Sequence, residues 1–225
     1  MDGVLVDNMK AHTDAWLELF RDRGFEIDMS AFIRKTAGMK AEEVVRLFLG
    51  SHISDGEALK ISDQKDFLYR VMYRKQLRPL QGLLKFLDSA EKNGISMGVA
   101  TGSSPENIEF VLGGLGLKRY FKRVVGAAEV QRGKPDPEIY LKVAAELDRS
   151  PEHCLVFEDA MSGLEAARRA GMKAIALTTS HSAGDFSGMP GIVHITPDFS
   201  SLTPDSVLLH LNGSHDFQSS HSRSK

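Results

Sequence analysis

Apolar residues in the first third of the chain recur with the spacing of amphipathic helices. Residues 11–20 place alanine, tryptophan, leucine and phenylalanine on one face, and similar patterns follow at residues 44–48 and 67–72. No proline interrupts these segments before Pro79. The pattern therefore predicts three helices in a compact helical unit over residues 9–78.

From Pro79 onward, short apolar runs bounded by turn residues alternate with amphipathic segments. Strands that alternate with helices favour an α/β fold with a doubly wound parallel sheet. We expect this core to comprise residues 1–8 and 79–208, followed by a disordered tail at 209–225 that is rich in serine and histidine. The predicted buried strands are residues 95–100, 124–125, 155–157, 174–177 and 192–195.

Composition narrows the class of protein. The 225 residues carry a formal net charge of -2, which gives no electrostatic reason to expect binding to nucleic acid or to an anionic membrane. No apolar run approaches the ~20 residues of a membrane helix, and no signal peptide is visible at the start. Cys154 is the single cysteine, which excludes an internal disulfide and fits a reducing compartment. We expect a cytoplasmic monomer.

Two stretches combine glycine with carboxyl or hydroxyl groups at predicted turns. Asp2 and Gly3 lie beside a short apolar run, where a carboxylate suits acid–base or metal chemistry, although Asp-Gly is also common in surface turns. Thr101, Gly102 and Ser103 follow a predicted strand and open a helix, so their hydroxyls and N–H groups predict an anion site. An ordinary strand-to-helix turn explains these three residues equally well.

Charged residues in two later segments add further chemistry. Lys134 lies in a loop that flanking prolines restrict, although a solvated lysine is the usual alternative. Glu158 and Asp159 follow a predicted strand. Mg²⁺ commonly binds one or two carboxylates together with substrate phosphate. A charged first turn of the next helix is the alternative, and the pattern completed by Gly163 favours the metal.

Taken together, these motifs resemble the haloacid dehalogenase superfamily, and most closely its branch with a small helical cap. That branch includes β-phosphoglucomutase-like enzymes and sugar-phosphate phosphatases. The resemblance depends on the order acid-Gly, Thr, Lys-Pro and Glu-Asp, and it extends to about Pro197. It implies a Rossmann-like core with residues 9–78 as the cap. It also implies a Mg²⁺-dependent phosphatase of a small phosphorylated metabolite, most simply a sugar phosphate, acting through an aspartyl-phosphate.

The resemblance also implies individual roles. Asp2 would act as general acid and base and would touch the metal through its carbonyl, while Asp159 would be a direct metal ligand with Glu158 beside it through water. Thr101 would hold the phosphoryl group, and Lys134 would offset its charge. The expected site thus comprises catalytic Asp2, Thr101 and Lys134, metal-binding Asp2, Glu158 and Asp159, and substrate-binding Gly102, Ser103, His12 and Lys65.

The first motif of this superfamily begins one residue before Met1. That residue is the nucleophilic aspartate at the end of the central strand, and the sequence includes neither the aspartate nor the strand. Without that strand, the strands at 95–100 and 155–157 would lose a neighbour, and unpaired buried backbone is costly. We therefore expect a start upstream of Met1 rather than an inactive relative. A chain that begins at Met1 is expected to have negligible phosphatase activity.

The cap residues leave the substrate open. His12 matches a cap-hinge histidine of the mutase branch, but a lone histidine on a helix is more often a surface or packing residue. Lys65 is equally well explained as a solvated lysine. The mutases carry an arginine after a cap glycine, whereas Gly38 is followed here by Met39 and Lys40, which favours hydrolysis. Two alternatives stay open: a β-phosphoglucomutase-like isomerase and a catalytically silent phosphate-binding protein.

Overall fold

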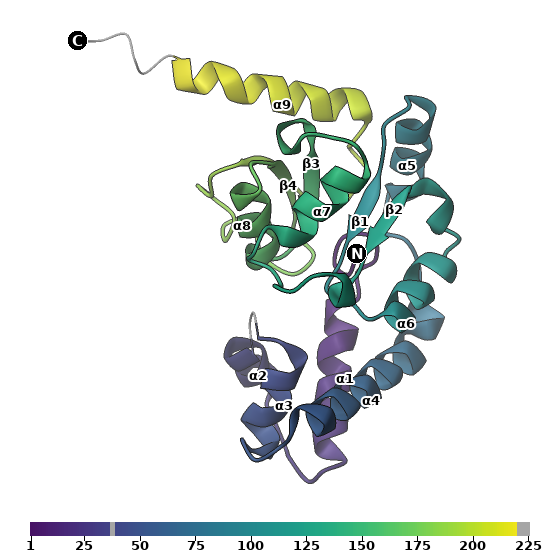
Figure 1. The fold of residues 1–225 in the computed structure, drawn as a ribbon, viewed down its shortest axis with the longest axis vertical. Coiled ribbons are helices and arrows are strands. Elements are labelled where there is room, and N and C mark those ends of the chain that lie inside the picture. The colour runs from purple at the N-terminus through teal and green to yellow at the C-terminus, as the bar shows by residue number, and fades with distance from the viewer. Residues whose placement is uncertain (37–38, 220–225) are drawn as a thin grey trace, which may run out of the picture. The chain divides into compact units, whose positions relative to one another are not determined.

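The computed structural model describes residues 1–36 and 39–219, and the chain divides into two compact units (Figure 1). The core unit contains Met1–Asp7 and Arg78–Lys225, and the cap unit contains Asn8–Leu77. The sequence predicts both boundaries of the inserted cap unit one residue further along the chain.

Helices account for the regular structure in the described residues of the cap unit. α1 and α3 pack against α4, and their aromatic side chains form a cluster in which the rings of Phe20 and Phe48 are 4.7 Å apart. The sequence predicts three of these four helices but not α2, where Phe32 is a buried side chain on a short segment. The helices are α1 (Met9–Arg21), α2 (Met29–Thr36), α3 (Ala41–Leu49) and α4 (Asp55–Tyr73).

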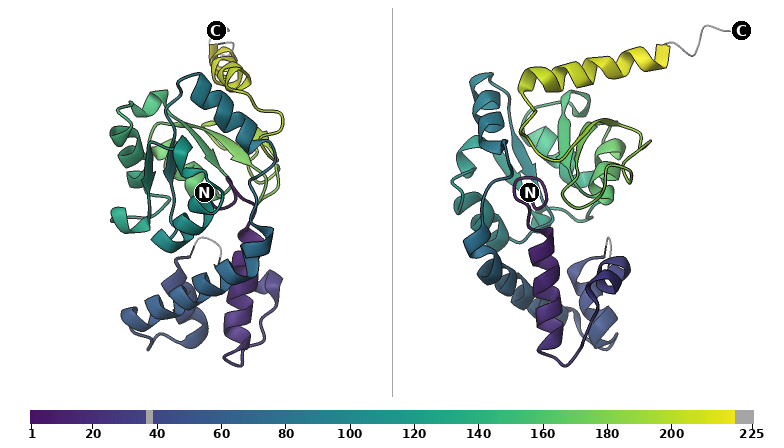
Figure 2. Two further views of the ribbon diagram at one scale, coloured as in Figure 1. Left: turned by 90° about the vertical axis from the view of Figure 1, so that its right-hand side faces the viewer. Right: turned by 180° about the vertical axis from the view of Figure 1, so that it is seen from behind.

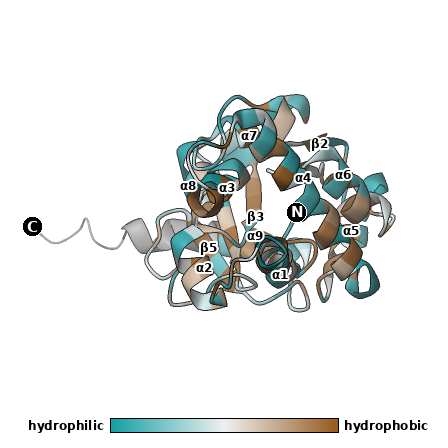
Figure 3. Cartoon of the chain, turned by 90° about the horizontal axis from the view of Figure 1, so that it is seen from below, coloured by the Kyte–Doolittle hydropathy of each residue, from teal (hydrophilic) through white to brown (hydrophobic). Residues whose placement is uncertain are grey.

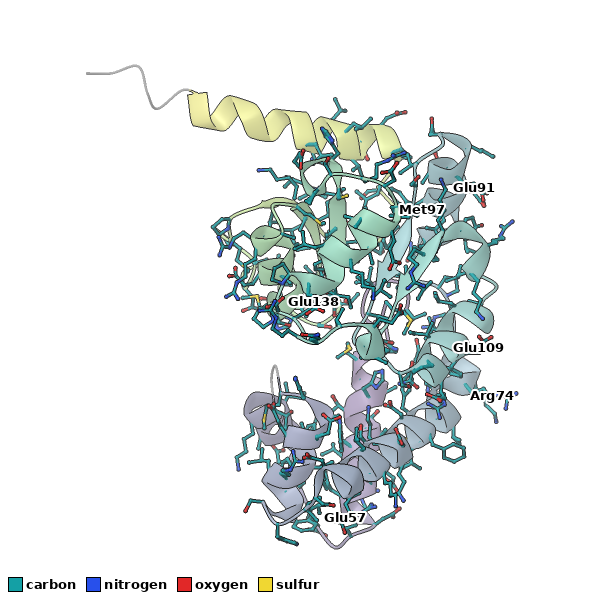
Figure 4. All side chains as sticks on the ribbon, viewed as in Figure 1. Glu57, Arg74, Glu91, Met97, Glu109 and Glu138 are labelled. Atoms are coloured by element: carbon teal, nitrogen blue, oxygen red, sulfur yellow. The ribbon has the colours of Figure 1, made fainter. Side chains whose placement is uncertain are left out.

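A capping box fixes the start of α4. Ser54 Oγ accepts a hydrogen bond from the backbone N–H of Glu57 at 3.3 Å, and the Glu57 carboxylate accepts one from the backbone N–H of Ser54 at 3.1 Å. Two N–H groups that the helix leaves without intrahelical partners are thereby satisfied. Glu57 is labelled near the start of this helix in Figure 4.

The strands described in the core unit are short and pair in parallel, which confirms the predicted α/β class. β1 pairs with β2, and β4 lies between β3 and β5 in a separate sheet. Within the described residues, no strand pairs with both β1 and β3. The strands are β1 (Gly98–Ala100), β2 (Arg123–Val125), β3 (Leu155–Glu158), β4 (Lys173–Leu177) and β5 (Ile192–Thr196).

Helices cover the strands of the core unit (Figure 2). α7 lies against β1 and β2, and α8 against β3 and β4. Their buried side chains form an apolar core that includes Ile139, Leu164 and Ala176, and Figure 3 shows β3 in the hydrophobic colour. These helices are α5 (Leu83–Lys92), α6 (Pro105–Ile108), α7 (Glu138–Glu146), α8 (Met161–Arg169) and α9 (Pro204–Ser219).

The sequence predicts a disordered tail from residue 209, whereas α9 continues through Ser219. Pro204 and Asp205 suit the first turn of a helix, and Val207 is buried. α9 contacts β5 and α5. The polar composition of the segment does not indicate these tertiary contacts. The last part of the predicted tail, residues 220–225, lies outside the described residues.

The first residues form a largely buried turn. Met1 O accepts hydrogen bonds from Val4 N at 3.3 Å and from Leu5 N at 2.7 Å. Gly3 has a φ of 66°, which favours glycine, and Val6 is fully buried. The turn therefore fixes Asp2 inside the core unit.

No helix in the described parts of the chain, 1–36 and 39–219, combines the length and the apolar character that a membrane crossing requires.

Candidate active site

Several distant segments bring the predicted polar residues to the carboxyl ends of strands in the core unit. Thr101 directly follows β1, Glu158 is the last residue of β3, and Asp159 follows it. Lys134 lies in the loop before α7, and Asp2 lies in the first turn. This is the edge at which parallel α/β sheets bind ligands.

A chain of hydrogen bonds joins the first turn to the turn after β1. Ser103 Oγ donates to Asp2 Oδ2, and Thr101 Oγ1 donates to Ser103 Oγ at 2.9 Å. The backbone N–H of Ser103 donates to Thr101 Oγ1 at 3.2 Å. A Cβ added to Gly102 would meet no atom within 4 Å, so the turn faces open space at this residue. The structure thus brings Asp2, Thr101 and Ser103 together.

The half-buried Lys134 forms an ion pair with the buried carboxylate of Glu158. Lys134 Nζ donates to Glu158 Oε1, which also accepts a hydrogen bond from Tyr140 Oη at 3.0 Å. The Lys134 ammonium lies 4.8 Å from the centre of the Tyr140 ring. Burial raises the pKa of Glu158, but the charges of Lys134 and of the Met1 ammonium group, together with hydrogen bonds, outweigh it and lower the pKa to about 2. Burial and the nearby Glu158 raise the pKa of Tyr140 well above its ordinary value.

Both oxygens of Glu158 are engaged inside the protein. Glu158 Oε2 accepts hydrogen bonds from the backbone N–H groups of Asp159 at 2.8 Å and Ala160 at 3.1 Å. A Cβ at Gly163 would lie 2.0 Å from Glu158 Oε1, so only glycine leaves room for this carboxylate. Glu158 is therefore placed to organise its neighbours, and its oxygens are already occupied as acceptors.

Glu138 holds the loop that carries Lys134. Its two carboxylate oxygens accept hydrogen bonds from Gln131 N at 2.9 Å and Arg132 N at 3.0 Å. Asp136 Oδ1 accepts a hydrogen bond from the backbone N–H of Glu138 at 3.0 Å, at the start of α7. Figure 4 labels Glu138 at the start of α7, from which the side chain reaches back to the loop.

Asp159 is a buried carboxylate with few compensating partners. Ser180 Oγ donates to Asp159 Oδ2, and a Cβ at Gly3 would lie 2.0 Å from the same oxygen. Burial, followed by the negative charge of Glu158, raises the pKa of Asp159 to about 6. The Met1 ammonium group contributes a positive charge nearby, and burial lowers the pKa of that group. Gly3 thus follows Asp2 in the chain and lies close to Asp159 in space.

The protein offers few carboxylates for Mg²⁺, and water and substrate phosphate would complete the site. No three His, Cys, Asp or Glu side chains in residues 1–36 and 39–219 form a ready group for a metal ion. Mg²⁺ does not require such a group, because it keeps waters and commonly takes one or two protein carboxylates plus substrate phosphate. The missing Cβ at Gly3 leaves room for the Asp159 carboxylate, and the destabilised charge of that carboxylate suits a cation at this position.

The sequence does not identify Tyr140 or Ser180 as site residues. Tyr140 lies on α7, in a pattern that predicts only helix, and Ser180 follows β4 in a segment without a motif. One signal was available for Ser180, because a loop after a parallel strand lies at the same edge as the other loops. Nothing in the spacing of α7 indicates that Tyr140 would contact Glu158.

His12 and Lys65 belong to the cap unit, where they contact each other. Lys65 Nζ lies 3.4 Å from His12 Nδ1 and forms an ion pair with Asp66. The His12 ring stacks on Tyr69 with centroids 3.7 Å apart, and Lys65 lies over Trp16. Lys65 is buried rather than solvated. Gly38, which the resemblance marks in the cap, lies outside the described residues.

A family model described as haloacid dehalogenase-like hydrolase matches residues 1–171, about three quarters of the chain. The chain belongs to this family. Among curated hydrolase relatives, the chain is 33% identical over 175 residues to fructose-1-phosphate phosphatase YqaB of Escherichia coli, covering 78% of this chain and 92% of the relative. It is 31% identical over 182 residues to β-phosphoglucomutase of Bacillus subtilis, covering 78% and 79%.

The share of each relative that the chain covers differs from one relative to the next. The match to the chloroplastic 5-amino-6-(5-phospho-D-ribitylamino)uracil phosphatase of Arabidopsis thaliana is 28% identical over 181 residues, which is 80% of this chain but 48% of the plant protein. Among solved structures, a hydrolase of family IA, variant 3, from Entamoeba histolytica superposes with a TM-score of 0.88 and 25% identity. That comparison covers 94% of this chain and 96% of the other, which confirms the predicted fold.

Proposed function

We propose that this protein hydrolyses the phosphate monoester of a small metabolite, most simply a sugar phosphate. The observation that supports this most is the meeting of a carboxylate, two hydroxyls, a lysine and a second carboxylate around the first turn of the core unit. Similarity to phosphatases of phosphorylated small molecules agrees with this assignment.

The residues divide the work of phosphoryl transfer. The backbone N–H groups of the open turn at Gly102 bind the phosphoryl oxygens, and the Thr101 hydroxyl joins them by turning from Ser103 to the phosphate. Lys134 has ammonium protons beyond the one given to Glu158, and these offset charge on the transferring group. Glu158 orients Lys134 and is not itself a direct metal ligand in this proposal.

Asp2 supplies the proton transfer. Its carboxyl group protonates the leaving alcohol and then accepts a proton from the attacking water. Ser103, which donates to Asp2 Oδ2, holds the carboxyl in place. Asp159, together with Asp2, would hold Mg²⁺, which supplies charge neutralisation and orientation of the phosphate when bound.

The attacking carboxylate of this reaction is not among the residues of the sequence. In the proposed scheme it would precede Met1, at the end of a strand lying between β1 and β3. The absence of a strand that pairs with both β1 and β3 in the described residues supports this placement. The 225-residue chain alone is then expected to release no phosphate above background.

The experiment compares two proteins. The first is the 225-residue chain, and the second carries an added apolar strand that ends in aspartate directly before Met1. Phosphate release is measured on a panel of sugar phosphates and nucleotides with MgCl₂ or with EDTA, and an added strand ending in asparagine is the control. Only the aspartate extension should turn over, and only with Mg²⁺. Hydrolysis by the 225-residue chain would refute the position of the nucleophile, and no hydrolysis by the extended chain would refute the phosphatase.

A second candidate is an isomerase that moves phosphate between positions of one sugar. The similarity to β-phosphoglucomutase of Bacillus subtilis favours this candidate. Lys40, the cation that follows Gly38 where the mutases carry an arginine, is exposed at the start of α3, and its backbone N–H donates to Glu43. Incubation of the extended chain with a sugar 1-phosphate and a bisphosphate activator separates the two, because an isomerase yields the 6-phosphate and a phosphatase yields free phosphate. A silent phosphate-binding protein would bind phosphate without yielding either product.

A further inference from the structure

Three consecutive residues after β4 contact both acid-bearing segments of the core unit. Thr179 Oγ1 donates to the backbone carbonyl of Gly3. Ser180 Oγ donates to Asp159 Oδ2, and His181 Nδ1 lies 3.0 Å from the backbone carbonyl of Asp159. Since a carbonyl only accepts, this last contact is a hydrogen bond when Nδ1 carries the proton. We call residues 179–181 the β4 loop.

The fold explains why the β4 loop reaches these atoms. β4 runs parallel to β3 with Ala176 opposite Glu158, so both strands end at the same edge. The residues after β4 form turns rather than a helix before β5 begins. The β4 loop is therefore short enough to remain at the strand ends.

The far side of the β4 loop is anchored. The His181 ring packs near Phe186, with centroids 5.6 Å apart, and Phe186 is almost fully buried. Ser182 Oγ donates to Asp185 Oδ2 at 2.7 Å, which closes the next turn. The His181–Phe186 contact anchors the β4 loop, whereas the Ser182–Asp185 bond belongs to the turn that follows it.

We propose that Ser180 is a positioning residue that orients the Asp159 carboxylate and sets the affinity of the core unit for a divalent cation. This inference rests on the proposed function, in which Asp159 binds Mg²⁺. A carboxylate oxygen has more than one lone pair, so Asp159 can accept from Ser180 and still coordinate a cation. Hydrogen bonds of this kind, from a residue behind the metal ligand, typically change metal affinity 10–100-fold when removed.

The Thr179 and His181 contacts extend the same argument to the backbone. Thr179 fixes the carbonyl of Gly3, whose neighbour is Asp2, and His181 fixes the carbonyl of Asp159. The β4 loop thus holds both proposed ligand segments at once. A change in Ser180 alone leaves these two backbone contacts in place and isolates the effect on the carboxylate.

The test titrates MgCl₂ into the full 225-residue chain and its variants by calorimetry, into the millimolar range. Ser180→Ala should weaken Mg²⁺ binding by about tenfold. Ser180→Thr, which keeps the hydroxyl, should bind Mg²⁺ as tightly as the parent chain. Ser182→Ala is the matched control, because Ser182 belongs to the same exposed segment but bonds Asp185. Thermal melting without Mg²⁺ checks that each variant is folded, which the exposure of Ser180 favours.

The outcomes separate the inference from the function on which it rests. Weaker binding in Ser180→Ala alone, with recovery in Ser180→Thr, supports the positioning role. Equal Mg²⁺ affinity in Ser180→Ala and the parent chain overturns that role and leaves the proposed function intact. Equal weakening in Ser182→Ala also overturns it, because the effect would then belong to the segment as a whole. Failure of the parent chain to bind Mg²⁺ overturns the positioning role, whereas the proposed hydrolysis is tested separately with the extended chain.

Discussion

Replacing Lys134 by methionine should destabilise the core unit through the charge that it leaves on Glu158. The variant keeps an apolar side chain of similar length but removes the cation from a carboxylate that is 5% exposed. The lowering of the Glu158 pKa from 4.5 to about 2 corresponds to about 3 kcal/mol at about 1.4 kcal/mol per pKa unit. Lys134 makes the largest favourable contribution to that shift, and breaking a buried pair costs about 3–5 kcal/mol. We therefore expect a loss of about 3 kcal/mol at neutral pH.

The pH dependence of that loss identifies its cause. Because the folded-state pKa of Glu158 lies below its ordinary value, its stabilising contribution is full above pH 4.5 and is lost as the pH falls through about 2. In Lys134→Met, burial without the cation raises the pKa of Glu158, so the carboxyl is protonated at mildly acidic pH and the destabilisation shrinks. Urea unfolding followed by circular dichroism at about pH 7 and about pH 4 measures this difference.

A matched control is available on the adjoining helix. Lys142 Nζ donates to the backbone carbonyl of Glu129 at 2.9 Å and is not part of the Glu158 pair. Lys142→Met should cost less than about 1 kcal/mol at either pH. A loss below about 1 kcal/mol in Lys134→Met at neutral pH, or a loss that does not change with pH, would show that the ion pair does not stabilise the fold as argued.

Three further outcomes follow from individual residues. Gly3→Ala should cost roughly 1–3 kcal/mol in urea unfolding and should weaken Mg²⁺ binding, because the added Cβ would lie 2.0 Å from Asp159 Oδ2. Gly171→Ala is the control for backbone strain alone, since Gly171 also has a positive φ but faces open space. The pKa of Asp159 is raised from 3.8 to about 6, so its contribution to stability is full below pH 3.8 and is lost as the pH rises through about 6. Mg²⁺ binds the ionised carboxylate, so MgCl₂ should raise Tm more at about pH 7.5 than at about pH 5. An equal rise in Tm at both pH values would contradict this. Phe20→Ala removes a fully buried ring of the cap unit and should cost about 3–5 kcal/mol by urea unfolding, and a loss below about 1 kcal/mol would disprove the packing.

Local patterns in the sequence predict the elements that are long or strongly marked. Ser104 caps α6 and Pro105 is its first residue, a local signature of a helix start, and the predicted apolar run before Glu158 forms β3. These elements are predictable because capping and apolar runs are local signals. The predicted site residues at the ends of β1 and β3 could be located for the same reason, since loops at strand ends need only the strand positions.

Features that depend on tertiary contact could not be predicted. Tyr140 reaches Glu158 from α7, and Ser180 reaches Asp159 from the segment after β4, and neither contact leaves a pattern in the sequence. The burial of Lys65 depends on Trp16 and Asp66, so a lysine expected equally as a solvated residue is enclosed in the cap unit. In α9, contact with β5 outweighs a polar composition that predicts disorder.

The first turn of the chain connects the two groups of site residues. In the described residues β1 and β3 belong to separate sheets, so no strand pairing joins these groups. Asp2 bonds Ser103 after β1, and Gly3 contacts Asp159 after β3 and accepts a hydrogen bond from Thr179 after β4. Hydrogen bonds and close packing therefore join the site where strand pairing does not. A strand ending immediately before this turn would meet both groups at once, which is why the proposed nucleophile and the existing carboxylates would share one phosphate.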